Sequence, residues 1–308
     1  MIRHFLRDDD LSPAEQTLVL DRAERLKRDR FAERPLEGPK TAAVIFDKTS
    51  TRTRVSFSVG VSDLGGAPLI MDSGSSQLGV KESIEDTAKV LSRMVSLIVW
   101  RTFSHAGLEE MAANSSVPVI NSLSDDFHPC QILADLLTIR EHKGELAGLT
   151  ATYLGDSANN MGHSYLLGLA TAGMHVRIAG PAGFHPRADI IADAEKIAAQ
   201  TGGSVTVLQD PVAAVTGADA VITDTWVSMG QEAEKAERVE RFGPYRVTPE
   251  LMQLAQPDAI FLHCLPAYRE YEVDAAVIDG PQSVVWDEAE NRVHAQKALM
   301  SWLLDESN

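Results

Sequence analysis

A run of hydroxyl and guanidinium side chains at residues 48–54 has the chemistry needed to bind a phosphoryl group or another oxyanion. It reads Lys-Thr-Ser-Thr-Arg-Thr-Arg and follows Ala42–Phe46, an apolar segment typical of a buried strand. From Thr53 onward, apolar residues recur at helical spacing until Gly65-Gly66. The run therefore lies where a strand ends and a helix begins. Free backbone N–H groups and the positive end of the helix dipole favour an anion at such a place.

Other chemically active side chains follow other predicted strands or open a helix. Arg101, Asp224 and Cys264 each come directly at or near the end of an apolar segment, and His128 and Gln131 open a helical pattern. Taken singly, such a histidine is most often a cap, and such a cysteine is most often a small core residue. Because the carboxyl ends of parallel strands meet at one edge of a sheet, we expect these groups to lie near the phosphoryl-binding loop.

Short apolar segments alternate with helical patterns along the whole chain. Strands are predicted at 42–46, 97–101, 118–121, 150–154, 175–179, 204–208, 220–223, 259–262 and 283–286. Helices are predicted from Thr53, from about Ser83, from His128 to about Lys143, and from about Asp287 to Leu304. This alternation predicts an α/β fold of two doubly wound parallel-sheet domains with an active-site cleft between them. The domain boundary is expected near residues 140–150.

Composition and charge exclude several classes of protein. The chain has 308 residues, 44% hydrophobic content and a net charge of -16, which argues against a nucleic-acid partner. No apolar run approaches the roughly 20 residues that a membrane span needs, and the N-terminus has no signal-peptide core. The two cysteines, Cys130 and Cys264, are far apart in sequence and are predicted to be free thiols. We therefore expect a cytoplasmic protein with no membrane partner.

The segment Thr152–Asn160 raises the alternative of a dinucleotide-dependent oxidoreductase. It contains Gly155 but lacks the other two glycines of the G-x-G-x-x-G fingerprint, which disfavours that class. Asp156, Asn159 and Asn160 suit an amino acid better. The sequence contains neither a G-x-x-x-x-G-K-[ST] loop nor a zinc-ligand spacing, so no cofactor and no metal are expected. A non-catalytic metabolite-binding protein stays open, and an activity assay separates it from an enzyme.

Four motifs together resemble the aspartate/ornithine carbamoyltransferase superfamily, and most closely its ornithine carbamoyltransferase branch. They are Ser50-Thr51-Arg52-Thr53-Arg54, His128-Pro129-Cys130-Gln131, Asp224-Thr225-Trp226-Val227-Ser228-Met229-Gly230 and His263-Cys264-Leu265-Pro266. The resemblance covers essentially the whole chain, in the right order. The first motif marks the superfamily. The last two mark the ornithine branch, because the aspartate branch is expected to have proline in place of Cys264 and to lack the Ser-Met-Gly segment.

The resemblance implies transfer of the carbamoyl group of carbamoyl phosphate to the δ-amine of L-ornithine, giving citrulline and phosphate. It implies a carbamoyl-phosphate-binding domain at residues 1–142, with a C-terminal helix at about 287–308 packed on it, and an ornithine-binding domain at 143–286. The residues implied to bind carbamoyl phosphate are Ser50, Thr51, Arg52, Thr53, Gln77, Arg101, His128, Pro129, Cys130, Gln131, Cys264, Leu265 and Arg292. Those implied to bind ornithine are Asn160, Asp224, Ser228 and Met229.

Catalytic roles and partners follow from the same resemblance. Arg101 and His128 are expected to polarise the carbonyl group, and Asp224 with Cys264 to orient the attacking amine. Gln77 resembles the loop residue that enters a neighbouring subunit's site, which implies a homotrimer, and Lys81 could accompany it. A place in arginine biosynthesis is expected. Sister enzymes that use aspartate, putrescine or an acylated ornithine are the nearest alternatives, and Asp224 disfavours acceptors whose α-ammonium is blocked or differently placed.

Overall fold

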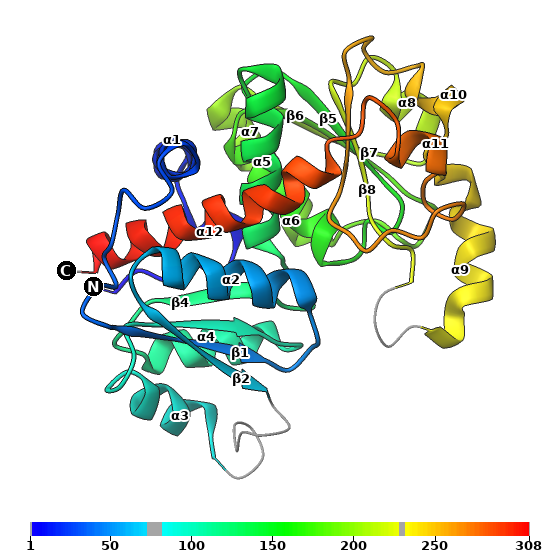
Figure 1. Cartoon of the computed structure of the whole chain (residues 1–308). Coiled ribbons are helices and arrows are strands. Elements are labelled where there is room, and N and C mark those ends of the chain that lie inside the picture. Colours follow the sequence, from blue (N-terminus) through cyan, green and yellow to red (C-terminus); the bar gives the residue numbers. More distant parts are fainter. Residues whose placement is uncertain (1, 73–81, 228–231, 308) are drawn as a thin grey trace. The chain divides into compact units, whose positions relative to one another are not determined.

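The computed structural model describes residues 2–72, 82–227 and 232–307, and the chain divides into two compact units (Figure 1). Unit 1 comprises Met1–Leu137 and Glu290–Asn308, and unit 2 comprises Thr138–Ala289. Both boundaries fall inside helices: α5 (Pro129–Lys143) and α12 (Val285–Glu306). Each unit contains one parallel sheet with helices, which confirms the predicted fold class. No helix in the described ranges is both long enough and apolar enough to span a membrane.

Unit 1 is built on a four-stranded parallel sheet in the order β2-β1-β3-β4. Its strands are β1 (Thr41–Phe46), β2 (Ala67–Asp72), β3 (Leu97–Arg101) and β4 (Val119–Leu123). Its further helices are η1 (Asp8–Asp10), α1 (Pro13–Arg28), α2 (Thr51–Asp63), α3 (Ile84–Leu91) and α4 (His105–Asn114). Because β1 leads to β2 on one side and β3 leads to β4 on the other, the topological switch point lies between β1 and β3.

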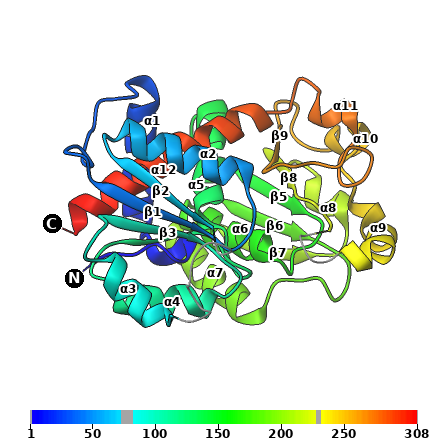
Figure 2. The ribbon, with the colours of Figure 1, turned by 60° about the horizontal axis from the view of Figure 1, so that its bottom comes forward.

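Helices cover both faces of the unit 1 sheet, α3 and α4 on one and α2 with the C-terminal part of α12 on the other (Figures 1 and 2). On the first face, Ile45 and Trp100 pack against Ala88 of α3 and Leu108 of α4. On the second face, α2 approaches α12 so closely that a Cβ at Gly60 would lie 3.2 Å from a side-chain carbon of α12. Strands enclosed in this way are nearly continuous apolar runs, as the sequence indicated.

Unit 2 is built on a five-stranded parallel sheet in the order β7-β6-β5-β8-β9. Its strands are β5 (Thr150–Leu154), β6 (His175–Ala179), β7 (Ser204–Leu208), β8 (Ala220–Thr223) and β9 (Ile260–His263). Its further helices are α6 (Asn160–Thr171), α7 (Ala188–Thr201), α8 (Pro211–Val215), η3 (Glu232–Glu234), α9 (Lys235–Phe242), η4 (Gly243–Tyr245), α10 (Pro249–Met252) and α11 (Ala275–Ile278). Here the switch point lies between β5 and β8.

The predicted strand at 283–286 is wrong. Ser283 forms only an isolated bridge with Phe261, and Val285 already begins α12, whose first turn carries two acidic residues that favour a helix N-terminus. The elements that were not predicted include helix α4, the edge strand β2, which contains Pro68, and helix α1, which begins with a capping box between Ser12 and Glu15.

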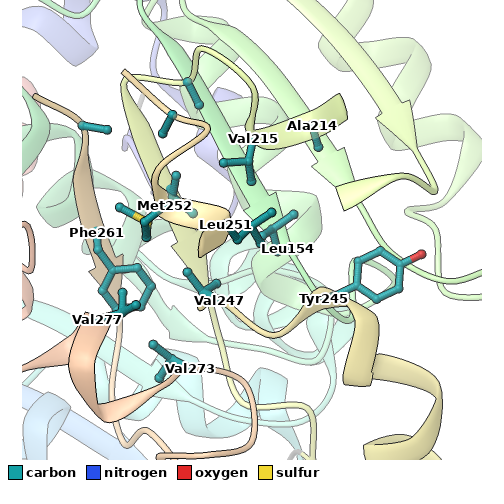
Figure 3. Packing of buried hydrophobic residues seen from close by; sticks show 14 of the residues in the cluster. Leu154, Ala214, Val215, Tyr245, Val247, Leu251, Met252, Phe261, Val273 and Val277 are labelled. Atoms are coloured by element: carbon teal, nitrogen blue, oxygen red, sulfur yellow. The ribbon is translucent and has the colours of Figure 1, made fainter. Parts of the chain in front are cut away.

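A substitution at Phe261 tests the packing of unit 2. Its ring is fully buried in the cluster between β9, β8 and helices α8, α10 and α11 (Figure 3). Phe261→Ala removes this ring and leaves a cavity, so we expect it to lower the free energy of unfolding by about 3–5 kcal/mol. Urea denaturation followed by circular dichroism measures the change, with Phe261→Leu as a smaller truncation. Equal midpoints for wild type and Phe261→Ala would contradict the packing described.

Candidate functional site

The switch point of unit 1 brings the end of β1 beside the end of β3. Phe46 and Arg101 are partners in the parallel register. Beyond them, the N–H of Asp47 donates to the Arg101 carbonyl oxygen at 2.8 Å, and Nε1 of Trp100 donates to Oδ2 of Asp47 at 2.9 Å. These two bonds extend the contact past the strands, so the loop that leads into α2 is fixed against the residue that carries the Arg101 guanidinium.

The N-terminus of α2 is formed by residues of the phosphoryl-binding motif. Ser50 is its N-cap, and Oγ of Ser50 accepts a hydrogen bond from the N–H of Thr53 at 3.2 Å. Thr51 is the first helical residue and is exposed. Thr53 is buried, and its Oγ1 accepts a hydrogen bond of 2.7 Å from Nη2 of Arg292, a buried residue in the part of α12 that belongs to unit 1. Arg292 is thereby held against the helix N-terminus.

The cations near this helix differ in how they are paired. Arg54 forms an ion pair with Asp72, and Lys48 forms one with Asp125. Arg52 is half-buried, and no acid within the described ranges lies in ion-pair contact with it. Among the arginines of the motif, Arg52 is therefore the one whose charge is left for a ligand.

His128 precedes Pro129, the first residue of α5, and its imidazole is buried. Burial holds the pKa of His128 well below its ordinary value of 6.5, and four neighbouring cations act in the same direction. These cations are Arg292, Arg101, Lys48 and Arg52. The imidazole is therefore neutral at pH 7. A neutral imidazole beside several positive charges can donate a hydrogen bond to an oxygen that gains negative charge.

The next residues of the same motif are buried in unit 1. Nε2 of Gln131 donates to Oδ1 of Asp135 at 2.8 Å, which orients the amide along α5. Sγ of Cys130 donates to the carbonyl oxygen of Asn121 at 3.3 Å. Burial raises the pKa of the Cys130 thiol far above its ordinary value, so this group stays protonated and behaves as a core side chain.

The switch point of unit 2 places two acidic residues at adjacent strand ends. Leu154 of β5 and Thr223 of β8 are partners in the register, and Asp156 and Asp224 follow them. Asp224 is buried, and Oδ1 of Asp224 accepts a hydrogen bond of 3.2 Å from Sγ of Cys264. Burial raises the pKa of Asp224, and the hydrogen bond from the Cys264 thiol partly offsets this rise. The structure therefore brings together Asp224 and Cys264, as the sequence predicts.

His263 is held by hydrogen bonds at both ring nitrogens. The N–H of Leu265 donates to Nδ1 at 2.9 Å, so Nε2 carries the hydrogen and donates to Oε1 of Glu272 at 3.3 Å. Leu265 has a φ of 57°, in the left-handed region, and this hydrogen bond fixes it there.

Ligand atoms of Asp224, His263 and Cys264 lie within 4.8 Å of one another. A metal ion at that point would have to displace one of the two hydrogen bonds to His263.

Asn160 is half-buried at the first position of α6, beside the N-cap Asn159, whose Oδ1 accepts a hydrogen bond of 3.0 Å from the N–H of Gly162.

A cavity of about 180 Å³ lies next to the end of β8. It is lined by Thr225, Trp226, Val227, Lys235, Val239, Tyr268, Tyr271 and Glu272. Four residues singled out in the sequence lie outside the described residues: Gln77, Lys81, Ser228 and Met229.

Two family models cover nearly the whole chain. The model of the aspartate/ornithine carbamoyltransferase carbamoyl-P binding domain matches residues 3–141, and that of the Asp/Orn binding domain matches residues 147–303. Among curated proteins, the ornithine carbamoyltransferase of Clavibacter sepedonicus is 71% identical over 307 residues and covers 100% of both chains. That of Bifidobacterium longum is 61% identical and covers 98% of this chain and 95% of the relative.

Solved structures give the same relationship. The ornithine carbamoyltransferase of Pyrococcus furiosus has a TM-score of 0.93 and 47% identity, and covers 97% of this chain and 96% of its own. An anabolic ornithine carbamoyltransferase of Campylobacter jejuni also has a TM-score of 0.93, with 38% identity, and covers 99% of this chain and 100% of its own.

The buried, neutral state of His128 predicts a dependence of stability on pH. Below about 6.5, the unfolded chain binds a proton that the folded imidazole does not, so stability falls as the pH falls from about 6.5 toward the lower folded pKa. The free energy of unfolding then changes with a slope that approaches about 1.4 kcal/mol per pH unit. His128→Gln has no imidazole at this position and therefore lacks this pH dependence. The difference in free energy of unfolding between wild type and His128→Gln is therefore expected to change between about pH 7.5 and about pH 5.5. Urea denaturation measures it, and a constant difference would mean that folding leaves the pKa of His128 unchanged.

Proposed function

Since this chain belongs to the aspartate/ornithine carbamoyltransferase family and transfers the carbamoyl group of carbamoyl phosphate to ornithine, we propose that each unit holds one of the two substrates. Carbamoyl phosphate binds to unit 1, and ornithine binds to unit 2. The observation that carries this proposal is the contrast between the two switch points. The one in unit 1 presents cations and a neutral imidazole, and the one in unit 2 presents a carboxylate beside a thiol.

The phosphate of carbamoyl phosphate binds at the N-terminus of α2. Free N–H groups, hydroxyls and the guanidinium of Arg52 provide donors there without a metal ion. The chain has a net charge of -16, so this local positive charge has to capture the anion against a repulsive overall field. The further contacts proposed for carbamoyl phosphate are Ser50, Thr51, Thr53, Gln77, Arg101, His128, Pro129, Cys130, Gln131, Cys264, Leu265 and Arg292.

The chemical step forms a C–N bond and breaks a C–O bond at the carbamoyl carbon. The neutral δ-amine attacks, negative charge grows on the carbonyl oxygen, and phosphate leaves. The proton that the nitrogen gives up is taken up by the departing phosphate, which ends as hydrogen phosphate. Arg101 and neutral His128 are the donors proposed for the carbonyl oxygen, and removing one such donor costs about 3–4 kcal/mol in a serine protease. The leaving phosphate needs its charge neutralised, which Arg52 supplies without transferring a proton.

The amine is the harder part of the reaction. A free δ-ammonium resembles that of lysine, with a pKa of about 10.4, so less than about one molecule in a thousand is neutral at pH 7. We propose that Cys264 lies within hydrogen-bond reach of the δ-amine and that Asp224 with Asn160 binds the amino-acid end. The Cys264–Asp224 hydrogen bond supports this pairing, since it holds the thiol and the carboxylate in one orientation. Ser228 and Met229 complete the proposed ornithine contacts.

Assembly and cellular role are proposed on the family alone. A homotrimer in which Gln77 enters a neighbouring subunit's site fits the resemblance of its loop, and a cytoplasmic location fits the two free thiols. A biosynthetic direction, toward citrulline for arginine, is supported by the similarity to a structure described as anabolic.

An acceptor panel tests the proposed recognition of ornithine. Carbamoyl phosphate is supplied with ornithine, aspartate, putrescine or acetylornithine in parallel, and the carbamoylated product and phosphate are measured. We expect citrulline from ornithine alone, because Asp224 requires a free α-ammonium in a fixed position. Turnover of putrescine or acetylornithine at a similar rate would contradict the role of Asp224 and leave the phosphate site unaffected.

Cys264 provides a second prediction. Cys264→Ala removes the group proposed to orient the amine, so we expect kcat to fall about tenfold or more. Cys264→Ser is the matched variant, because its hydroxyl can still donate to Asp224, and it should retain more activity than alanine. A near-normal kcat and pH profile for Cys264→Ala would rule out this role.

A further inference from the structure

Arg238 is a buried cation that the proposed reaction does not use. Its side chain is 8% exposed, and the side chain of its partner Asp156 is 6% exposed. Nη1 of Arg238 donates to Oδ2 of Asp156 at 2.7 Å and to the carbonyl oxygen of Trp226 at 3.1 Å. Nε donates to Oε2 of Glu234 at 2.8 Å. One side chain of α9 therefore binds the residue that follows β5 and the loop that follows β8.

Aromatic rings surround this guanidinium. The guanidinium carbon Cζ of Arg238 lies 5.3 Å from the centroid of the Phe184 ring and 5.9 Å from that of the Phe242 ring. Phe242 in turn stacks on Trp226 at 6.0 Å, and the carbonyl oxygen of Phe184 accepts a 2.6 Å hydrogen bond from Ser157. The rings come from α9 and from the loops after β6 and β8, so the carboxyl ends of three adjacent strands are joined to α9 around one charge.

The backbone contact at Trp226 brings this cluster to the proposed ornithine site. Trp226 is two residues after Asp224 in the same loop, and Glu234 lies on the other side of residues 228–231, which are outside the described residues. Arg238 thus binds a described residue on each side of that stretch. The Trp226 ring also lies against Gly155, where an added Cβ would approach it to 3.3 Å, so a larger residue there would push the loop away.

Arg238 also changes the balance of buried charge in unit 2. The switch point of unit 2 carries two buried carboxyl groups, Asp156 and Asp224. An uncompensated buried carboxylate is costly, and it would compete for the ammonium of a ligand. Arg238 pairs with Asp156, whereas the side-chain contact of Asp224 within the described residues is the hydrogen bond from the Cys264 thiol.

We propose that Arg238 is a positioning residue for ornithine: it ties the loop that carries Asp224 to the end of β5, and it neutralises Asp156 so that Asp224 is the acid left for the ligand's ammonium. This inference rests on the proposed role of Asp224. It assigns no contact between Arg238 and either substrate.

Steady-state kinetics with both substrates varied, together with thermal unfolding, test this role. For Arg238→Met we expect KM for ornithine to rise about tenfold or more, as for the loss of a charged hydrogen bond, while KM for carbamoyl phosphate stays within about twofold. Arg238→Lys keeps the charge beside Asp156 and should recover part of the ornithine affinity. If Arg238→Met does not fold, the lysine variant carries the test, with a smaller rise in the same constant.

The double variant Asp156→Asn with Arg238→Met separates positioning from charge compensation. It leaves no uncompensated charge, so the melting temperature should return toward that of wild type, but Trp226 still lacks its donor and KM for ornithine should stay raised. Arg177→Met is the matched control in unit 2, because Arg177 donates to the carbonyl oxygens of Ala214 and Thr216 away from this loop. It should lower the melting temperature without changing KM for ornithine.

Two outcomes would overturn the inference. An unchanged KM for ornithine in Arg238→Met, with only a lower melting temperature, would make Arg238 a purely structural residue. Full recovery of this KM in the double variant would reduce its role to charge compensation. Asp224→Asn is measured alongside, and an unchanged KM for ornithine there would overturn the role of Asp224 itself, whatever Arg238 does.

Discussion

Parallel pairing of the strands is the constraint on which the rest of this structure depends. In a parallel sheet every strand points the same way, so all carboxyl ends meet at one edge and all return connections cross the faces. Each unit then has one place where neighbouring connections diverge, between β1 and β3 in unit 1 and between β5 and β8 in unit 2. Most of the polar residues proposed to bind the substrates follow those four strands or the next one along, and Arg292 of α12 is an exception. Their positions are therefore a consequence of backbone hydrogen bonding more than of contacts with each other.

The two switch points carry groups of opposite charge, and burial shifts the pKa of one group at each of them. In unit 1, burial and surrounding cations keep His128 neutral, so it can donate a hydrogen bond without adding to the positive field. In unit 2, burial raises the pKa of Asp224, and the thiol of Cys264 is hydrogen-bonded to it. Under the proposed assignment, an anion and an ammonium are attracted by different units of one strongly acidic chain. Separation of charge within the fold achieves what the net charge of -16 alone would oppose.

Strands enclosed on both faces could be predicted from the sequence. A strand buried on both faces consists of a nearly continuous run of apolar residues, as at Thr150–Leu154 and Ala220–Thr223. Edge strand β2 could not, since its side chains alternate in exposure and it contains Pro68. Site residues inside motifs, such as Ser50 and Asp224, were found from local chemistry. The ion-pair partner of Asp156 could not be predicted in this way, because Arg238 is 82 residues away in the sequence, within an ordinary amphipathic helix pattern. Only the folded chain brings them together.

The different surroundings of the two cysteines have a practical consequence. Cys130 is fully enclosed, and its thiol is kept protonated, whereas Cys264 is half-buried at the end of β9. Electrophiles react with accessible cysteine side chains, so Cys264 is the more open of the two thiols to them, and it is the thiol that we propose lies next to the reacting amine. An alkylating fluorophore would therefore label the molecule at a single point and report on occupancy there. The same selectivity would direct thiol oxidation to a side chain that we propose takes part in the reaction.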